Sequence, residues 1–243
     1  MTNPAKPSSN HKDRLAVALD VPSAQLALEL ADQLSGTCQW LKVGMELYYA
    51  AGNALVEELR KRGFNIFLDL KLHDIPNTVA GAVRSASQAG TSLLTIHAFG
   101  GPAMMAAAAE AASGPNAPKL LAVTVLTSMD AEQLAAIGVP SSPADQVLRL
   151  GRLAKQAGID GMVCSAEEVG ILRAELGPEV LLVIPGIRPA GSDIGDQKRI
   201  ATPALAIQHG ASMLVVGRPI TRAADPAAAA SAILKEIEEA IQD

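Results

Sequence analysis

Eight short apolar runs alternate with helix-like segments along this chain of 243 residues, and this alternation constrains the fold more than any other feature. The runs are continuously apolar, as is typical of parallel strands that are covered on both faces. They are Leu15–Leu19, Trp40–Val43, Ile66–Leu68, Leu93–Ile96, Leu120–Leu126, Gly161–Cys164, Leu181–Ile184 and Met213–Val216. Eight strand and helix units in a chain of this length predict a single (β/α)8 TIM barrel of the α/β class.

The segments between the runs are amphipathic or alanine-rich and predict helices. The clearest are Ala24–Leu34, Ala54–Lys61, Ala103–Ala112 and Ala144–Ala157. Gly63, Gly90 and Gly158 stand where the left-handed residue that closes many helices is expected. Asp225 and Pro226 predict the start of the last helix, because an acceptor cap followed by proline favours a first turn. A doubly wound open sheet is the alternative fold, but no G-x-G-x-x-G turn follows the first run.

No linker, repeat or low-complexity tract divides the chain. We therefore expect one catalytic barrel domain over residues 14–243, preceded by a flexible N-terminal tail over residues 1–13. The tail lacks the apolar centre of a signal peptide, and no apolar run approaches the ~20 residues of a membrane-spanning helix. These features predict a cytoplasmic protein with no membrane partner. Cys38 and Cys164 are far apart in the sequence, which predicts buried reduced thiols and not a zinc site.

The charge and the aromatic content argue against a nucleic-acid partner. The formal net charge is −5, and the chain has three Phe, two Tyr and one Trp. A nucleic-acid surface needs cations that neutralise phosphates and usually aromatic rings that stack on bases. We expect neither a basic surface nor bound nucleic acid.

The segment from Asp69 to Thr78 carries the strongest functional signal. Asp69, Lys71 and Asp74 stand within six positions after an apolar strand. Alternate residues of a strand share a face, so Asp69 and Lys71 should point the same way. Charges at the end of an apolar strand are usually paired or functional, and a purely structural ion pair is the alternative to a catalytic group.

Further polar residues follow the other apolar runs. Barrel enzymes carry their chemistry at the C-terminal ends of the strands. The residues at these positions are Asp20, Lys42, Thr127, Ser128, Arg188, Gly217 and Arg218. We expect them to lie on one rim together with the Asp69 to Thr78 segment.

This set of residues resembles the orotidine 5'-phosphate decarboxylase family over nearly the whole chain from Leu15 onward. The matching segments are Leu19-Asp20, Lys42-Val43-Gly44, Asp69 to Thr78, Val123 to Ser128, Pro185 to Arg188, Gly195 to Gln197 and Val216 to Pro219. The resemblance implies conversion of orotidine 5'-phosphate, the substrate, to uridine 5'-phosphate and carbon dioxide. This is the last step of de novo UMP synthesis, and it would use no metal and no cofactor.

The resemblance also implies the catalytic roles. Lys71 would stabilise the carbanion at C6 of the substrate and protonate it, and the charges would alternate in the order Lys42, Asp69, Lys71, Asp74. Neighbouring carboxylates should keep the ammonium protonated and fix its position, which is the preorganisation that electrostatic catalysis needs. Asp69 would lie near the substrate carboxylate and raise the ground-state energy by repulsion.

Binding roles follow from the same resemblance. Asp20 would bind the ribose hydroxyls, Thr127 and Ser128 would meet the ribose or the polar edge of the pyrimidine, and Pro185 would pack near the base. Residues in the loops after the last two strands would hold the phosphate, as is common in barrels. They are Arg188, Gln197, Gly217 and Arg218, and residues Pro189 to Thr202 would form a lid.

In this family the start of the helix after the third strand reaches into a neighbouring subunit. Asp74, Ile75 and Thr78 would therefore complete the partner's site, which implies a homodimer with shared active sites. His73 and His97 are interpreted as packing histidines, and His11 and His209 carry no signal.

Two other functions remain open from the sequence. Magnesium-dependent sugar-phosphate decarboxylases and aldolases of the same superfamily share the D-x-K-x-x-D pattern, but the resemblance places a carboxylate where this chain has Lys42. An ammonium there would repel the dication and remove an oxygen ligand. A non-catalytic barrel that binds a nucleotide is the second alternative, although a pure binder has no need of buried alternating charge.

Overall fold

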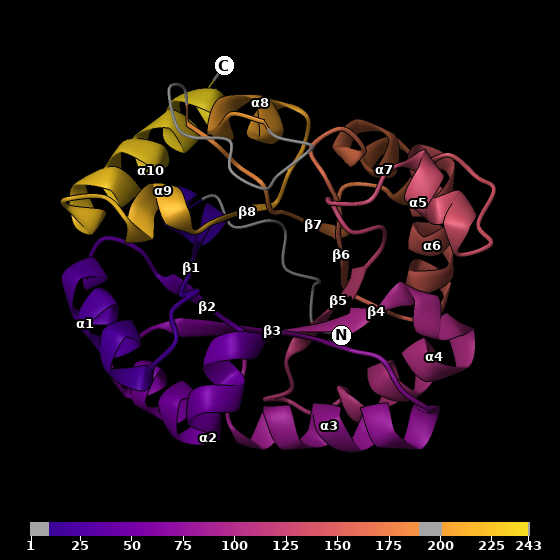
Figure 1. Cartoon of the computed structure of the whole chain (residues 1–243), viewed down its shortest axis with the longest axis horizontal. Helices are drawn as coiled ribbons and strands as arrows, with labels where there is room; N and C mark the ends of the chain where they lie inside the picture. The colour runs from indigo at the N-terminus through magenta and orange to yellow at the C-terminus, as the bar shows by residue number, and fades with distance from the viewer. Residues whose placement is uncertain (1–9, 190–200, 243) are drawn as a thin grey trace.

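The eight predicted strands form a closed parallel barrel in which each strand pairs with its sequence neighbours and β8 pairs with β1. The structure is a computed structural model that describes residues 10–189 and 201–242. The strands make an inner ring and the helices surround it (Figure 1). They are β1 (Leu15–Ala18), β2 (Trp40–Gly44), β3 (Asn65–Leu72), β4 (Leu93–His97), β5 (Lys119–Val123), β6 (Gly161–Val163), β7 (Leu181–Ile184) and β8 (Met213–Val216). The predicted (β/α)8 barrel is confirmed.

The helices follow the strands in the expected alternation. They are η1 (His11–Arg14), α1 (Ala24–Leu34), α2 (Met45–Lys61), α3 (Pro76–Gln88), η2 (Ala98–Gly100), α4 (Gly101–Ala111), α5 (Ala131–Ala136), α6 (Pro143–Gln156), α7 (Val169–Leu176), α8 (Pro203–Gln208), α9 (Arg218–Thr221) and α10 (Pro226–Gln242). The backbone N–H of Ala228 donates to the Asp225 carboxylate over 2.9 Å, so the predicted cap of the last helix is confirmed. Gly63, Gly90 and Gly158 have φ values of 91°, 78° and 82°, which confirms the predicted helix ends.

Two separate apolar cores explain why the strands are apolar on both faces. Outward-facing residues such as Val17 and Leu41 pack against the helices in the larger core. Inward-facing residues fill the middle of the barrel in a smaller one, built around Ala16, Phe67, Leu93, Leu121, Val183 and Met213. This inner cluster blocks the barrel axis, so any site must lie above or below it.

Several boundaries differ from those expected; for example, β5 ends at Val123 and not at Leu126. Two further differences lie in the second helix and at the N-terminus. The second helix begins at Met45, not Ala54, and it changes direction at Gly52, whose φ is 62°. The segment before the kink is only two turns long, which is too short to show a clear helical period. At the N-terminus, η1 covers His11–Arg14, so residues 11–13 of the expected tail have regular structure. Residues 1–9 lie outside the described residues.

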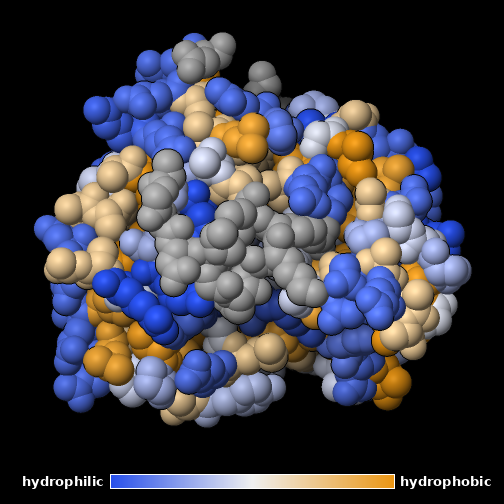
Figure 2. Space-filling view, turned by 45° about the horizontal axis from the view of Figure 1, so that its top comes forward, coloured by the Kyte–Doolittle hydropathy of each residue, from blue (hydrophilic) through white to orange (hydrophobic). Residues whose placement is uncertain are grey.

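The two cysteines are buried, as predicted, and form no disulfide in the described part of the chain. Burial raises the pKa of Cys38 to about 11, because the charged thiolate is poorly solvated there. None of the helices in the described part of the chain is long and apolar enough to cross a bilayer. In the space-filling view, hydrophilic residues spread over the visible face and hydrophobic ones form smaller separate patches (Figure 2).

Candidate active site

The C-terminal end of β3 places Lys71 and Asp69 in direct contact inside the barrel mouth. The Lys71 Nζ lies 2.8 Å from both carboxylate oxygens of Asp69. Both side chains are largely shielded, with 29% of Lys71 and 15% of Asp69 exposed. The prediction that they point the same way is confirmed.

The backbone at Lys71 departs from a regular strand. Leu68 is paired with Leu94 and Leu72 with Ile96, so four positions along β3 match only two along β4. Lys71 lies in this bulge with φ of 50°, a left-handed conformation that non-glycine residues rarely adopt. Such backbone strain costs about 1–3 kcal/mol and tends to occur at functional sites.

Thr95, on β4, holds this strained segment in place. Its hydroxyl donates to the Asp69 carboxylate over 2.9 Å and accepts the backbone N–H of Lys71 over 2.8 Å. Thr95 is completely buried. One side chain therefore fixes both the carboxylate orientation and the backbone of the lysine. The sequence reasoning missed this residue because a threonine fits an apolar strand run; its polarity at an inward-facing position was the available signal.

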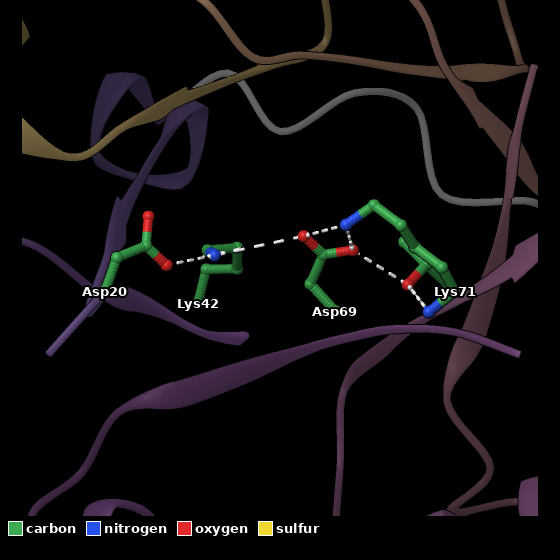
Figure 3. Close-up of polar contacts among 5 residues, drawn as sticks. Asp20, Lys42, Asp69 and Lys71 are labelled. Carbon is green, nitrogen blue, oxygen red and sulfur yellow. Dashed lines mark hydrogen bonds and ion pairs between the residues drawn. The ribbon is translucent and has the colours of Figure 1, made fainter. Parts of the chain in front are cut away.

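Lys42, on β2, continues the row of charges. Its Nζ lies 2.6 Å from Asp20 Oδ1 and 3.9 Å from Asp69 Oδ2, and the residue is buried. The observed order is Asp20, Lys42, Asp69, Lys71, in a single line across the mouth (Figure 3). Three members of the predicted row are thus in the predicted order.

Asp74 does not join this row within the chain. It is exposed, and the nearest contact of its carboxylate is the backbone N–H of Ile75. Ile75 and Thr78 are exposed as well, and Ile75 is 67% exposed despite being apolar. A single chain therefore keeps Asp74 away from Lys71, and its expected place in the site of a neighbouring subunit stays a prediction. Asp74 lies apart from Lys71 because the chain turns into α3 directly after β3.

A cavity of about 170 Å³ lies beside the charged row. Thr127 and Pro185 line it together with Lys42, Asp69 and Lys71, as their predicted roles require. Its remaining walls are apolar and come from several strands and the loop after β5. They are Phe67, Val123, Val125, Leu126, Val163, Cys164 and Val215, none of which was predicted as a site residue.

The residues predicted to hold a phosphate lie on the same rim. Arg188 follows β7 and is buried, and its backbone N–H donates to Ala201 O over 2.9 Å. Gly217 precedes α9, and a Cβ there would lie 3.6 Å from Asp20 Oδ2, so the loop after β8 approaches the charged row closely. Arg218 is half-buried at the start of α9, and Ser128 is exposed beyond β5. Gln197 and most of the expected lid lie outside the described residues.

His97 and His73 form a stacked pair next to the row. Their ring centroids are 5.4 Å apart, and Phe99 also contacts the ring of His97. Burial, followed by the nearby charges of His73 and Lys71, lowers the pKa of His97 to about 4. The assignment of His73 and His97 as packing residues remains a prediction.

Comparison with known proteins matches this geometry to one family. A model of the family "Orotidine 5'-phosphate decarboxylase / HUMPS family" matches residues 13–233. A protein named orotidine 5'-phosphate decarboxylase from Halorhodospira halophila is 54% identical over 228 residues, which cover 93% of this chain and 97% of that protein. The protein of the same name from Moorella thermoacetica is 51% identical over 234 residues, or 93% of each chain.

A solved structure is similar as well. The crystal structure of orotidine 5'-phosphate decarboxylase from Lactobacillus acidophilus superimposes with a TM-score of 0.83 at 41% sequence identity. The match covers 93% of this chain and 99% of that chain.

Proposed function

This chain belongs to the orotidine 5'-phosphate decarboxylase / HUMPS family, and we propose that it converts orotidine 5'-phosphate to uridine 5'-phosphate and carbon dioxide. The observation that carries the mechanism is the Lys71 ammonium, held 2.8 Å from both Asp69 oxygens in a strained bulge at the barrel mouth. In this role the enzyme completes de novo UMP synthesis.

The reaction needs a fixed positive charge beside one carbon. When the bond between C6 and the carboxylate breaks, its electron pair stays on C6 in the plane of the ring, where the π system delocalises it poorly. Lys71 stabilises this pair electrostatically and donates a proton from Nζ to C6, so that carbon dioxide leaves and a C–H bond replaces the C–C bond. Solvent then returns the proton to the amine. Because Asp69 and Thr95 already hold Lys71, little reorganisation is needed during bond cleavage.

Asp69 contributes in a second way. In the substrate complex its carboxylate lies beside the substrate carboxylate, and the repulsion between them disappears when neutral carbon dioxide departs. Stabilisation of the carbanion by Lys71 is the larger effect, because it acts on charge that develops in the transition state.

The remaining contacts with the substrate come from different parts of the rim. Asp20 has 59% of its side chain exposed, so its carboxylate can accept from the ribose hydroxyls while it holds Lys42. Thr127 and Ser128 meet the ribose or the pyrimidine edge, and Pro185 packs against the base. Arg188, Gln197, Gly217 and Arg218 bind the phosphate; this set rests on the family resemblance and on the placement of the described members around one opening.

The donor set does not suit a magnesium ion. Magnesium requires oxygen ligands in a near-octahedral arrangement. The Lys42 ammonium stands between Asp20 and Asp69, 2.6 Å and 3.9 Å from their oxygens, in the space that a bridging dication would need. We therefore assign no step to a metal or to any other cofactor.

We further propose a homodimer in which each chain completes its partner's site. The support is the exposed segment at the start of α3, where Asp74, Ile75 and Thr78 project without a role in their own chain's charged row. Ile75 in particular exposes an apolar side chain that an interface would cover. Two buried cysteines that form no disulfide between described residues fit a reducing compartment such as the cytoplasm.

The test is an ultraviolet assay of orotidine 5'-phosphate consumption in the presence of a chelator. Lys71→Ala should lower kcat by about 10³-fold or more while the nucleotide still binds, since the loss removes both the charge and the acid. Lys61→Ala, an exposed lysine 72% open to solvent, serves as the matched control and should keep full activity. Turnover that survives in Lys71→Ala would eliminate the proposed acid, and activity that the chelator abolishes would favour the magnesium-dependent alternative.

A further inference from the structure

The barrel has a second cavity at the end opposite to Lys71. Its volume is about 790 Å³, which lies within the range of small-molecule sites. The first residues of six strands line it, namely Trp40, Asn65, Leu93, Lys119, Leu181 and Met213. Val183 forms part of its wall and belongs to the inner core cluster, which separates this cavity from the charged row above. The proposed decarboxylation makes no use of this end of the barrel.

The charge of the lining is positive although the whole chain carries a net charge of −5. Arg14, Arg60 and Lys119 contribute three positive charges against the single carboxylate of Asp13. That carboxylate accepts a hydrogen bond from the indole N–H of Trp40 over 3.3 Å. The balance of charge therefore favours an anion.

Two polar atoms at the cavity are buried and lack a hydrogen-bond partner in the described part of the chain. They are Thr91 Oγ1 and Arg14 Nε. Thr91 is only 2% exposed, and both residues line the cavity. Both atoms are shielded from water, so neither contacts the cavity directly; they mark a polar wall with unused hydrogen-bonding capacity. The Arg14 guanidinium also donates from Nη1 to the backbone oxygen of Ala211 over 3.3 Å. Burial also lowers the pKa of Arg14.

Apolar rings complete the lining. Trp40 and Phe64 contribute aromatic surface to the same cavity as the cations. Gly90 packs against the head group of Arg60, because a Cβ at this position would overlap the guanidinium. Planar guanidinium and aromatic groups together suit a flat ligand with one charged end.

We propose that this cavity binds a small planar organic anion, with a carboxylate or a phosphate directed toward Arg14 and Arg60 and an aromatic or heterocyclic body against Trp40. This site lies beyond the proposed decarboxylation and does not depend on it. Both kinds of anion satisfy the same guanidinium donors, and the experiment separates them.

Trp40 provides a direct readout, since it is the only tryptophan in the chain. Phenyl phosphate and benzoate, titrated separately into the full-length protein, should each be tested for a saturable change in tryptophan emission. We expect saturation below about 10 mM for at least one of them, a range typical of small ligands with few contacts. The tighter of the two identifies the charged end.

Variants locate the site. Arg14→Gln and Arg60→Gln should each weaken binding about tenfold, because each removes a charge-assisted hydrogen bond. Lys61→Gln, at the exposed neighbour of Arg60, and Lys71→Ala, at the opposite mouth, should bind as the unchanged protein does. Lys119→Gln should also weaken binding, and because this residue is exposed, its replacement should not disturb folding.

Three results would overturn the proposal. One is the absence of any saturable change in emission with either probe. Another is equal affinity in Arg14→Gln, Arg60→Gln and the unchanged protein. The third is loss of the signal in Lys71→Ala alone, which would assign the binding to the charged row.

Discussion

At the scale of single residues, Thr95 links the catalytic carboxylate to the strained backbone of the lysine. Thr95→Val keeps the shape of the side chain but removes the hydrogen bond to Asp69 and leaves the backbone N–H of Lys71 without its acceptor. We expect kcat to fall about 10- to 100-fold with a smaller change in KM, because the lost hydrogen bonds hold Asp69 and Lys71 in position for the reaction.

The control for Thr95→Val is Thr124→Val, which also removes a buried hydroxyl. Thr124 Oγ1 donates to the backbone oxygen of Val163 over 2.9 Å, and not to a member of the charged row. Both variants should lose comparable stability, and only Thr95→Val should lose kcat. Thr95→Ser should restore most of the activity, because serine keeps both hydrogen bonds. Equal kcat in the two valine variants would contradict the positioning role.

His97 makes stability depend on pH. Its pKa is about 4 in the folded chain and near 6.5 when unfolded, so folding favours the neutral ring. The resulting stabilisation is fully present above about pH 6.5 and is lost as the pH falls from there toward 4. Because the side chain is partly exposed, we discount the effect to about 1–2 kcal/mol.

Urea unfolding between pH 4 and 7 measures this dependence. His97→Phe should flatten the slope of unfolding free energy against pH in this window, because phenylalanine cannot bind the proton. His209→Gln changes an exposed histidine and should leave the slope unchanged. An unaltered slope in His97→Phe would show that other groups govern the acid response.

At the scale of elements, the sequence predicted the regular parts of the barrel well. The runs Leu181–Ile184 and Met213–Val216 are strands with the predicted limits, and Ala24–Leu34 is a helix with the predicted limits. Burial on both faces requires apolar residues, so these segments are recognisable in the sequence. The bulge in β3 is not recognisable, because alternation of side chains assumes a regular strand and Lys71 interrupts that regularity.

The candidate site was predictable to a similar degree. Lys42, Asp69 and Lys71 follow from the rule that barrel chemistry lies at the C-terminal ends of strands. The contact between Asp20 and Lys42 depends on how β1 and β2 are paired, with Ala18 opposite Lys42, and no local pattern encodes it. Asp74 depends on a second chain in our proposal, so one sequence could not locate it.

The kink in α2 provides a test at this scale. Gly52 has φ of 62°, and no atom lies within 4 Å of the position that an added methyl group would take, so Gly52→Ala would strain the backbone without a steric clash. We expect a loss of about 1–2 kcal/mol in unfolding free energy. Gly170→Ala, in the first turn of α7, also adds a methyl in open space but at an ordinary helical φ, and should gain about 0.5–1 kcal/mol. Chemical denaturation of the two variants should thus give changes of opposite sign.

At the scale of the whole molecule, the proposed dimer makes a complementation experiment possible. A Lys71→Ala chain and an Asp74→Ala chain are each expected to be inactive alone. In a mixed dimer one site combines the intact Lys71 of one chain with the intact Asp74 of the other. Random mixing should restore about a quarter of the wild-type activity, since half of the dimers are mixed and one of their two sites is intact.

The measurement is the ultraviolet assay after the two variants are unfolded and refolded together. Refolding each variant separately and then combining the samples gives the control for subunit exchange. A mixture that stays inactive after joint refolding would place Asp74 in its own chain's site, and full activity of Asp74→Ala alone would place it outside the mechanism.

The pairing of β8 with β1 has a consequence for how the protein is made. During synthesis the N-terminal strands leave the ribosome first, yet β1 has no partner on one side until residues 213–216 emerge. Until then the nascent sheet has two open edges, which are the parts of a sheet most prone to join another polypeptide. A stall or a premature stop codon before Met213 therefore releases an unsealed sheet, and we expect such fragments to require chaperones or to be degraded.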